Sequence, residues 1–172
     1  YKGLTQFESK EHFLSYMKPD KWEHKVKTVD SFFWGSWHHN AIEFWVKEGF
    51  NGDSSDYLCF LSDYYPSDKV FILSSWFKAI KDNKIEILHS EMMVYHGVYE
   101  YAGTLDAIVK FDDAIMVADW KTGKADYTHF IQCEAYRRAY TWMTREEPVG
   151  RLVLRSDKDS PGKYEIKVRP LE

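Results

Sequence analysis

Residues 111–124 read FDDAIMVADWKTGK, and this stretch decides the fold that we predict for the chain. The apolar residues 114–118 have the composition of a buried strand. The Asp112-Asp113 pair before them suits a two-residue hairpin turn. Because side chains alternate along a strand, Asp119 and Lys121 project from the same face. A buried strand that ends on two opposite charges indicates a functional site as well as a structural element.

The strand before the turn supplies a second carboxylate. With residues 112 and 113 in the turn, facing residues have numbers that sum to 225, so Asp106 lies opposite Asp119. Their Cβ atoms are then roughly 5 Å apart. Two facing carboxylates repel, and apolar neighbours on the same face increase the cost of their charges. A bound cation would remove this conflict, and hard oxygen ligands favour Mg²⁺ or Mn²⁺.

The chemistry that this arrangement implies is phosphodiester hydrolysis. A divalent ion can activate a water molecule and neutralise charge on a phosphodiester oxygen. Lys121 could orient the water or stabilise the developing charge. The alternative is an ordinary surface ion pair between Asp119 and Lys121 with Asp106 exposed beside it, and such a pair contributes only about 0–1 kcal/mol.

Further patterns add to these three residues, although each also has an ordinary structural explanation. In GSWHHNAIE, His39 and Glu43 share one face of a predicted helix and could point toward the carboxylates. Glu91 lies in the middle of a predicted strand, where an unpaired buried carboxylate would be costly. Gly103 precedes Asp106 by three residues and allows a close approach to the backbone.

A last pattern lies in QCEAYRRAY, residues 132–140. Gln132 and Tyr136 are one helical turn apart, so they share a face of the predicted helix. The neighbouring Arg137 and Arg138 could hold phosphates. The alternative is a Tyr that packs in the core and a Gln that faces solvent.

Periodicity along the chain predicts an α/β fold. We expect helices over residues 5–18, 35–46, 67–81 and 127–143, a loop-like segment with a short apolar piece at 57–61 over residues 49–66, and strands over residues 85–95, 99–111, 114–122, 149–155 and 163–168. This order predicts a single domain over residues 1–172 with a central mixed sheet, a three-strand meander plus a C-terminal hairpin, flanked by helices.

Composition narrows the class of protein. With 172 residues, 44% of them hydrophobic, the chain can bury a substantial core. Cys59 and Cys133 have no CxxC spacing, so we expect no disulfide framework and no zinc or iron–sulfur site, and a cytoplasmic or other reducing compartment. No apolar run approaches eighteen residues, which predicts no membrane partner. All six arginines lie in the last 36 residues, where a polyanion could dock although the net charge is -4. Ordinary surface charge is the alternative, and this feature alone favours it.

The patterns occur in the order His, Glu, G-x-x-D, D-x-K-T-G and Q-x-x-x-Y, and in this order the chain resembles the RecB-type exonuclease branch of the PD-(D/E)XK nuclease superfamily. The resemblance covers residues 35–140 apart from a variable segment at 49–83. Residues 1–34, expected to be an N-terminal helical extension, also lie outside it. The resemblance implies a restriction-endonuclease-like fold.

The resemblance also implies a role for each matching residue. His39, Asp106, Asp119 and the backbone carbonyl of Trp120 would bind metal, Lys121 would be the catalytic lysine, and Glu91 would act near the metal through water. Gln132 and Tyr136 would contact DNA and support the site, with further support from Arg137, Arg138, Glu43 and Thr122.

The function that the resemblance implies is a DNA nuclease that uses one or two Mg²⁺ or Mn²⁺ ions. We expect an exonuclease of replication, recombination or repair that acts on single strands or duplex ends, alone, as a homo-oligomer or in a larger replication or recombination complex. The alternatives are a structure-selective flap or branch endonuclease and a nucleic-acid-binding module without catalysis. No GxxxxGK[ST] pattern occurs, so the chain carries no helicase motif, and the resemblance brings no iron–sulfur cluster because the cluster cysteines are missing.

Overall fold

A five-stranded mixed sheet forms the centre of the structure. The computed structural model describes residues 22–48, 54–122, 126–157, 160 and 162–171, with the backbone alone over 22–29. The strand order is β1-β2-β3-β4-β5, and only the β3–β4 pair is parallel. The predicted α/β fold with a meander, a C-terminal hairpin and flanking helices is therefore confirmed.

The strands follow the predicted ranges within two residues at each end. They are β1 (Glu86–His96), β2 (Tyr101–Phe111), β3 (Ala114–Lys121), β4 (Gly150–Ser156) and β5 (Tyr164–Pro170). The β2–β3 ladder runs from the Phe111–Ala114 pair to the Ala107–Ala118 pair, so its facing residues sum to 225 as expected. The next pair in this register is Asp106 with Asp119.

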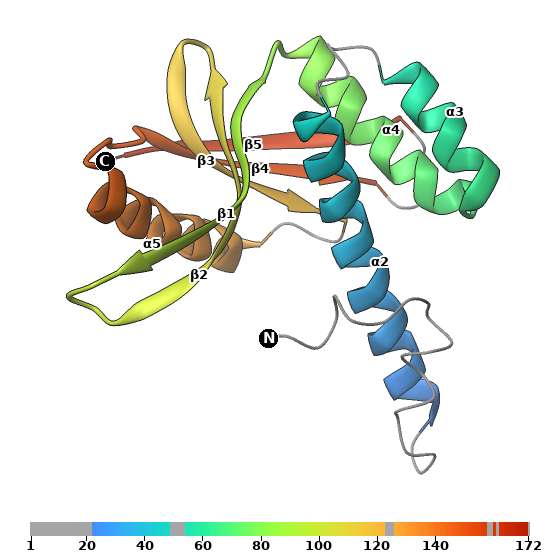
Figure 1. Ribbon diagram of the computed structural model, residues 1–172, viewed down its shortest axis with the longest axis horizontal. Coiled ribbons are helices and arrows are strands. Elements are labelled where there is room, and N and C mark those ends of the chain that lie inside the picture. The colour runs from blue at the N-terminus through green and yellow to red at the C-terminus, as the bar shows by residue number, and fades with distance from the viewer. Residues whose placement is uncertain (1–21, 49–53, 123–125, 158–159, 161, 172) are drawn as a thin grey trace.

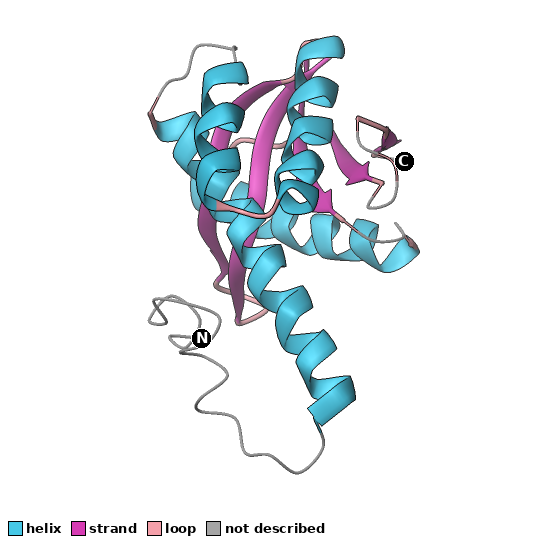
Figure 2. Ribbon diagram, turned by 90° about the vertical axis from the view of Figure 1, so that its right-hand side faces the viewer, coloured by secondary structure: helices cyan, strands magenta, loops and turns pink. Residues whose placement is uncertain are grey.

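Helices cover both faces of the sheet. On one side lie α2 (Trp22–Lys47), α3 (Ser55–Tyr64) and α4 (Ser67–Asp82), and on the other lies α5 (Tyr127–Thr144) (Figure 1). Figure 2 looks onto the α2–α4 side and shows α2 extending beyond the sheet. Helix α5 is the crossover that the parallel β3–β4 pair requires. Within the described part of the chain, no helix is both long and apolar enough to cross a membrane.

Two hydrophobic cores lie on opposite faces of the sheet. Under α2–α4, Leu73 and Trp76 pack against Trp120 and Leu154 from β3 and β4. Under α5, Phe130 and Tyr140 belong with Val117 and Val153 to the second core. Strand β3 contributes to both, which explains its continuous apolar run.

Two helical predictions differ from the structure. The helix predicted over residues 35–46 begins earlier, at Trp22. Residues 49–66 were expected to be loop-like at both ends around a short apolar piece, and no helix was predicted there, whereas residues 55–64 form α3. This short helix buries Tyr57 and Leu61, spaced i and i+4, against the α2–α4 layer. The helix predicted over residues 5–18 lies outside the described residues.

The β2–β3 turn offers a test of the register that faces Asp106 toward Asp119. Asp112 and Asp113 have φ angles of 48° and 62°, the positive values of a type I′ turn, for which Asn-Gly is the preferred pair. Replacing both (Asp112→Asn with Asp113→Gly) should therefore relieve backbone strain and raise the melting temperature by about 2–4 °C. Thermal unfolding followed by circular dichroism measures this.

The matched control is Asp113→Ala. It keeps a Cβ at a positive φ and removes the polar side chain that tolerates it, so the melting temperature should fall. A lower melting temperature for the Asn-Gly variant than for the wild type would contradict the turn.

Candidate metal centre and active site

Three side chains from three different elements meet where α2 approaches the middle of β1 and β2. His39 Nδ1 lies 3.0 Å from Glu91 Oε1 and 3.5 Å from Asp106 Oδ1. The three donor atoms lie within 4.8 Å of one another, close enough to share one cation. The structure thus brings together the helix, β1 and β2 residues that the sequence analysis selected.

The backbone of β1 bends at this point. Glu91 has a φ angle of 49°, which is unusual for a non-glycine residue within a strand. It lies between the Ser90–Ala107 and Met92–Leu105 pairs, directly across from Asp106, and a register shift precedes it between Ile87 and His89. Such strain costs of order 1–3 kcal/mol and persists only where the surrounding structure imposes it. Here it accompanies the contact between the Glu91 carboxylate and His39.

Asp119 and Lys121 form the second half of the site. Lys121 Nζ lies 2.8 Å from Asp119 Oδ1, and the Asp119 side chain is only 3% exposed. The other oxygen, Asp119 Oδ2, is buried and has no hydrogen-bond partner among the described residues. A buried carboxylate oxygen without a partner is costly unless something else satisfies it.

Asp106 connects the two halves. Its Oδ2 accepts a hydrogen bond of 2.8 Å from the Trp120 amide, which fixes the carboxylate against the end of β3. Its Oδ1 faces His39 instead. The Trp120 ring packs in the core under α2–α4, and the ligand role of the Trp120 carbonyl stays a prediction.

The arrangement differs in one respect from the expected pair of carboxylates on one ion. The set of close donor atoms consists of His39, Glu91 and Asp106, whereas Asp119 bonds to Lys121. One nitrogen and several carboxylate oxygens, including an unsatisfied buried one, suit a hard divalent cation such as Mg²⁺ or Mn²⁺. The residues present therefore fit the predicted metal.

Burial and neighbouring charges raise the pKa values of three side chains in this cluster. Burial, with the charge of Asp106 added, raises the pKa of Asp119 to about 6, although Lys121 opposes the shift. Burial also raises the pKa of Asp106, against the opposing charges of His39 and Lys121. For His39, burial would lower the pKa, but its hydrogen bond to Glu91 and the charge of Asp106 outweigh burial, and the pKa is raised.

The raised pKa of Asp119 predicts the direction of a pH effect. A carboxyl whose folded pKa of about 6 exceeds its unfolded value of 3.8 contributes stability below pH 3.8 and loses it as the pH rises through 6. Asp119→Asn, which stays neutral, should therefore raise the melting temperature in chelator at pH 8 by about 3–6 °C, or about 1–2 kcal/mol, and much less at pH 4.5.

Glu134→Gln is the control with the opposite sign. The hydrogen bond from Arg137 lowers the pKa of Glu134 to about 2, so the Glu134 charge stabilises the fold above pH 4.5 and its removal should lower the melting temperature at pH 8. A melting temperature for Asp119→Asn that is unchanged or lower at pH 8 would contradict the assignment of Asp119 as a strained carboxylate.

The pair predicted on α5 packs against β2. Gln132 Nε2 donates to Tyr136 Oη at 3.2 Å. A Cβ added to Gly103 would lie 2.7 Å from Tyr136 Cε1, so only glycine lets the ring lie on this strand. Gln132 is exposed and Tyr136 is half-buried, which leaves the amide accessible beside the ring.

Four other predicted residues lie apart from the cluster. Glu43 pairs with Lys47 on the next helical turn, and Thr122 lines a neighbouring hollow. Arg137 is buried and pairs with Glu134 and Glu147, while Arg138 pairs with Glu134. A role for these four in the site stays a prediction.

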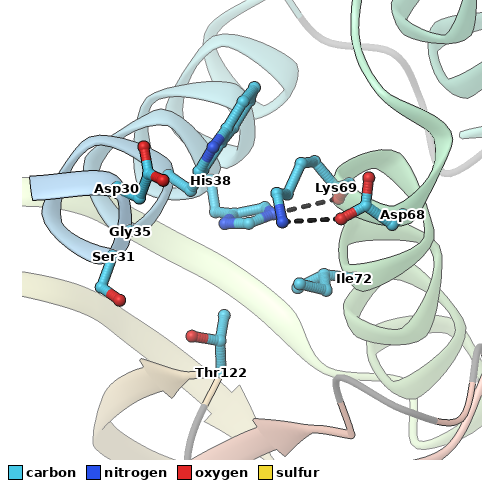
Figure 3. Close-up of a pocket in the computed structure, with 9 residues that line it drawn as sticks. Asp30, Ser31, Gly35, His38, Asp68, Lys69, Ile72 and Thr122 are labelled. Carbon is cyan, nitrogen blue, oxygen red and sulfur yellow. Dashed lines mark hydrogen bonds and ion pairs between the residues drawn. The ribbon is translucent and has the colours of Figure 1, made fainter. Parts of the chain in front are cut away.

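The hollow beside Thr122 contains residues that the sequence analysis did not select. Its volume is about 280 Å³, and it is lined by Asp30, Ser31, Trp34, Gly35, His38, Asp68, Lys69, Ile72 and Thr122 (Figure 3). His38 Nε2 lies 3.0 Å from the Lys69 carbonyl oxygen, and burial lowers the pKa of His38 to about 4. The hollow adjoins the cluster through two chain neighbours, His38 beside His39 and Thr122 beside Lys121.

Two further residues that the sequence analysis did not select for the site, Trp76 and Cys133, interact with the cluster. The Trp76 ring contacts His38 and His39 edge-on, with centroids 5.6 and 6.3 Å away. Burial, and then the charge of Asp119, raise the pKa of the Cys133 thiol, so this buried residue of α5 stays neutral. The His38-His39 pair in the sequence could have indicated the contact with Trp76.

Comparisons with known proteins found a similar solved structure but no family. No family model matches the chain, and no curated protein does. The crystal structure of SSO0001 is similar at 16% sequence identity with a TM-score of 0.34, over 78% of this chain and 64% of that one. The chain thus spans less than two thirds of the length of that protein.

Proposed function

We propose that the chain is a divalent-cation-dependent deoxyribonuclease that hydrolyses phosphodiester bonds in DNA, and that it acts as an exonuclease in replication, recombination or repair. The observation that carries the proposal is the buried Asp119 oxygen without a partner, one strand away from the His39–Glu91–Asp106 cluster and bonded through its other oxygen to Lys121. An ordinary ion pair between Asp119 and Lys121 does not explain the strained backbone of Glu91 in the neighbouring cluster.

Each residue then has a separate task. His39, Glu91, Asp106 and Asp119 would hold the cation, which when bound supplies an activated water and neutralises charge on the phosphodiester. The Trp120 amide keeps Asp106 in one orientation. Lys121, held by Asp119 at 2.8 Å, presents an ammonium to the negative charge that develops on the phosphate oxygens. Hydrolysis joins the water oxygen to phosphorus, breaks the P–O bond to the next nucleotide and returns a proton to the leaving oxygen.

The exonuclease assignment comes from the residues on α5. The Gln132–Tyr136 pair matches the Q-x-x-x-Y motif of the end-processing nucleases that the sequence resembles. The exposed Gln132 amide, fixed by Tyr136 on Gly103, offers a rigid polar contact for a DNA strand near the cluster. This contact supports recognition of a strand that enters from its end.

The test is cleavage of end-labelled linear DNA and covalently closed circular DNA in Mn²⁺. Wild-type protein should shorten linear DNA from its ends, and Asp119→Ala and Lys121→Ala should each lower the rate by at least about 100-fold. Lys78→Ala is the matched control, because Lys78 also pairs with an Asp but lies on the surface. This variant should cleave at the wild-type rate.

Two results would overturn the proposal at different levels. Rapid nicking of circles with no preference for ends would remove the exonuclease assignment and leave a nuclease. Unchanged cleavage in both folded site variants, or no cleavage by the wild type with any divalent ion, would remove the proposed function itself.

A further inference from the structure

Five of the six arginines gather along the outer side of α5. Two hollows of about 390 and 730 Å³ lie there and share Arg137, Arg138 and Glu147. Arg145 lines the first, with the β1–β2 hairpin tip, and Arg151 and Arg169 line the second, with the end of β5. Figure 1 shows α5 between this hairpin and the C-terminal end of the chain. We call the surface formed by Arg137, Arg138, Arg145, Arg151 and Arg169 the arginine groove.

The arginine groove is positive in a chain that is negative overall. Among the described residues that line it, two carboxylates, Glu134 and Glu147, face five guanidinium groups, which gives a local charge of +3 against a net charge of -4 for the chain. Glu134 lies within 4 Å of Arg137, Arg138 and Arg151, so three guanidinium groups share the charge of this one carboxylate. The excess charge lies on surfaces where phosphates would be attracted.

Two arginines of the groove have no carboxylate partner among the described residues. Within the described part of the chain, Arg145 contacts the Trp142 ring at 5.3 Å, and Arg169 contacts the rings of Tyr127 and Phe130 at 5.0 and 4.8 Å. These contacts orient the guanidinium groups without neutralising them. Arg151 Nε is also buried without a hydrogen-bond partner among the described residues.

Aromatic rings lie at both ends of the groove. At the hairpin end, the His96 ring stacks on Trp142 and on Tyr101, with centroids 4.9 and 5.6 Å apart and an interplanar angle of 26° in both pairs. Tyr99, 4.6 Å from His96, is 63% exposed. At the other end Tyr127 is 62% exposed. Exposed rings beside arginines are the combination that binds unpaired bases and their phosphates.

We propose that the arginine groove binds single-stranded DNA along the outer side of α5, on a surface separate from the metal centre. The inference rests on the proposed function for the identity of its ligand. Phosphates would contact Arg145 and Arg169, and a base would stack on Tyr99 at the hairpin end. A duplex fits these contacts less well, because its bases are already stacked on one another and show no free face.

The test measures binding in chelator, where cleavage does not enter. The probe is a labelled oligothymidylate of about 16 nucleotides, the upper end of common single-strand site sizes, followed by fluorescence anisotropy. Arg145→Gly with Arg169→Met should lower the affinity at least tenfold and reduce the slope of log affinity against log salt by about 1.4, or about 0.7 for each lost phosphate contact.

The variants are chosen so that misfolding cannot imitate loss of binding. Arg145 has a φ angle of 66°, which glycine adopts without strain, so Arg145→Gly should keep or raise the melting temperature. Arg169→Met keeps an unbranched apolar stem over Phe130. Arg155→Met is the control, since it removes a positive charge outside the groove, beside Glu165, and it should leave the affinity near the wild-type value.

Tyr99→Ala separates a nucleic-acid site from a general polyanion site. It should lower the affinity for oligothymidylate and leave the affinity for inorganic polyphosphate unchanged, because polyphosphate has no bases. Equal losses of affinity in the groove variants and in the Arg155 control would overturn the proposal, as would tighter binding of a duplex of the same length.

The inference and the proposed function can fail separately. If the groove binds DNA but the protein cleaves none, only the proposed function is refuted. If the protein cleaves DNA but the groove variants bind it as the wild type does, only DNA binding by the groove is refuted.

Discussion

The structure depends on the burial of two carboxylates, Asp106 and Asp119, at facing positions on β2 and β3. Their repulsion is offset by His39 on one side and Lys121 on the other, and by the Trp120 amide between them. The compensation is incomplete, because Asp119 Oδ2 has no partner among the described residues and its pKa is raised to about 6 by burial and by Asp106. A divalent cation would complete it.

The rest of the fold holds this cluster in place. Strand β3 is buried on both faces, so the end that carries Asp119 and Lys121 cannot move without disturbing both cores. Helix α2 supplies His39 from one layer, and α5 supplies Gln132 and Tyr136 from the other. The site is therefore assembled from both layers of a rigid sheet, which is the arrangement that precise positioning of catalytic groups requires.

Local patterns sufficed to predict the sheet. The Asp112-Asp113 turn set the β2–β3 register, and apolar runs bounded by turn residues located the other strands within two positions. Helix α3 was missed because it is only ten residues long and buries only two side chains, Tyr57 and Leu61. The left-handed Glu91 was also beyond prediction, because nothing in HSEMMVYHG signals that tertiary contacts override the strand geometry. The salt bridge of Arg137 to Glu147 was also beyond prediction, because Glu147 lies ten residues along the chain and beyond the end of the helix.

The most direct test of the buried-carboxylate account is calorimetric titration with Mn²⁺ at pH 6 and pH 8, in two buffers of different ionisation enthalpy. Because the cluster holds protons in the absence of metal, binding should release protons at pH 6, and the affinity should rise toward pH 8. His39→Gln and Asp119→Asn should each weaken binding. Absence of Mn²⁺ binding, or binding that releases no protons and is unaltered in both variants, would contradict the claim that these residues form a cation site.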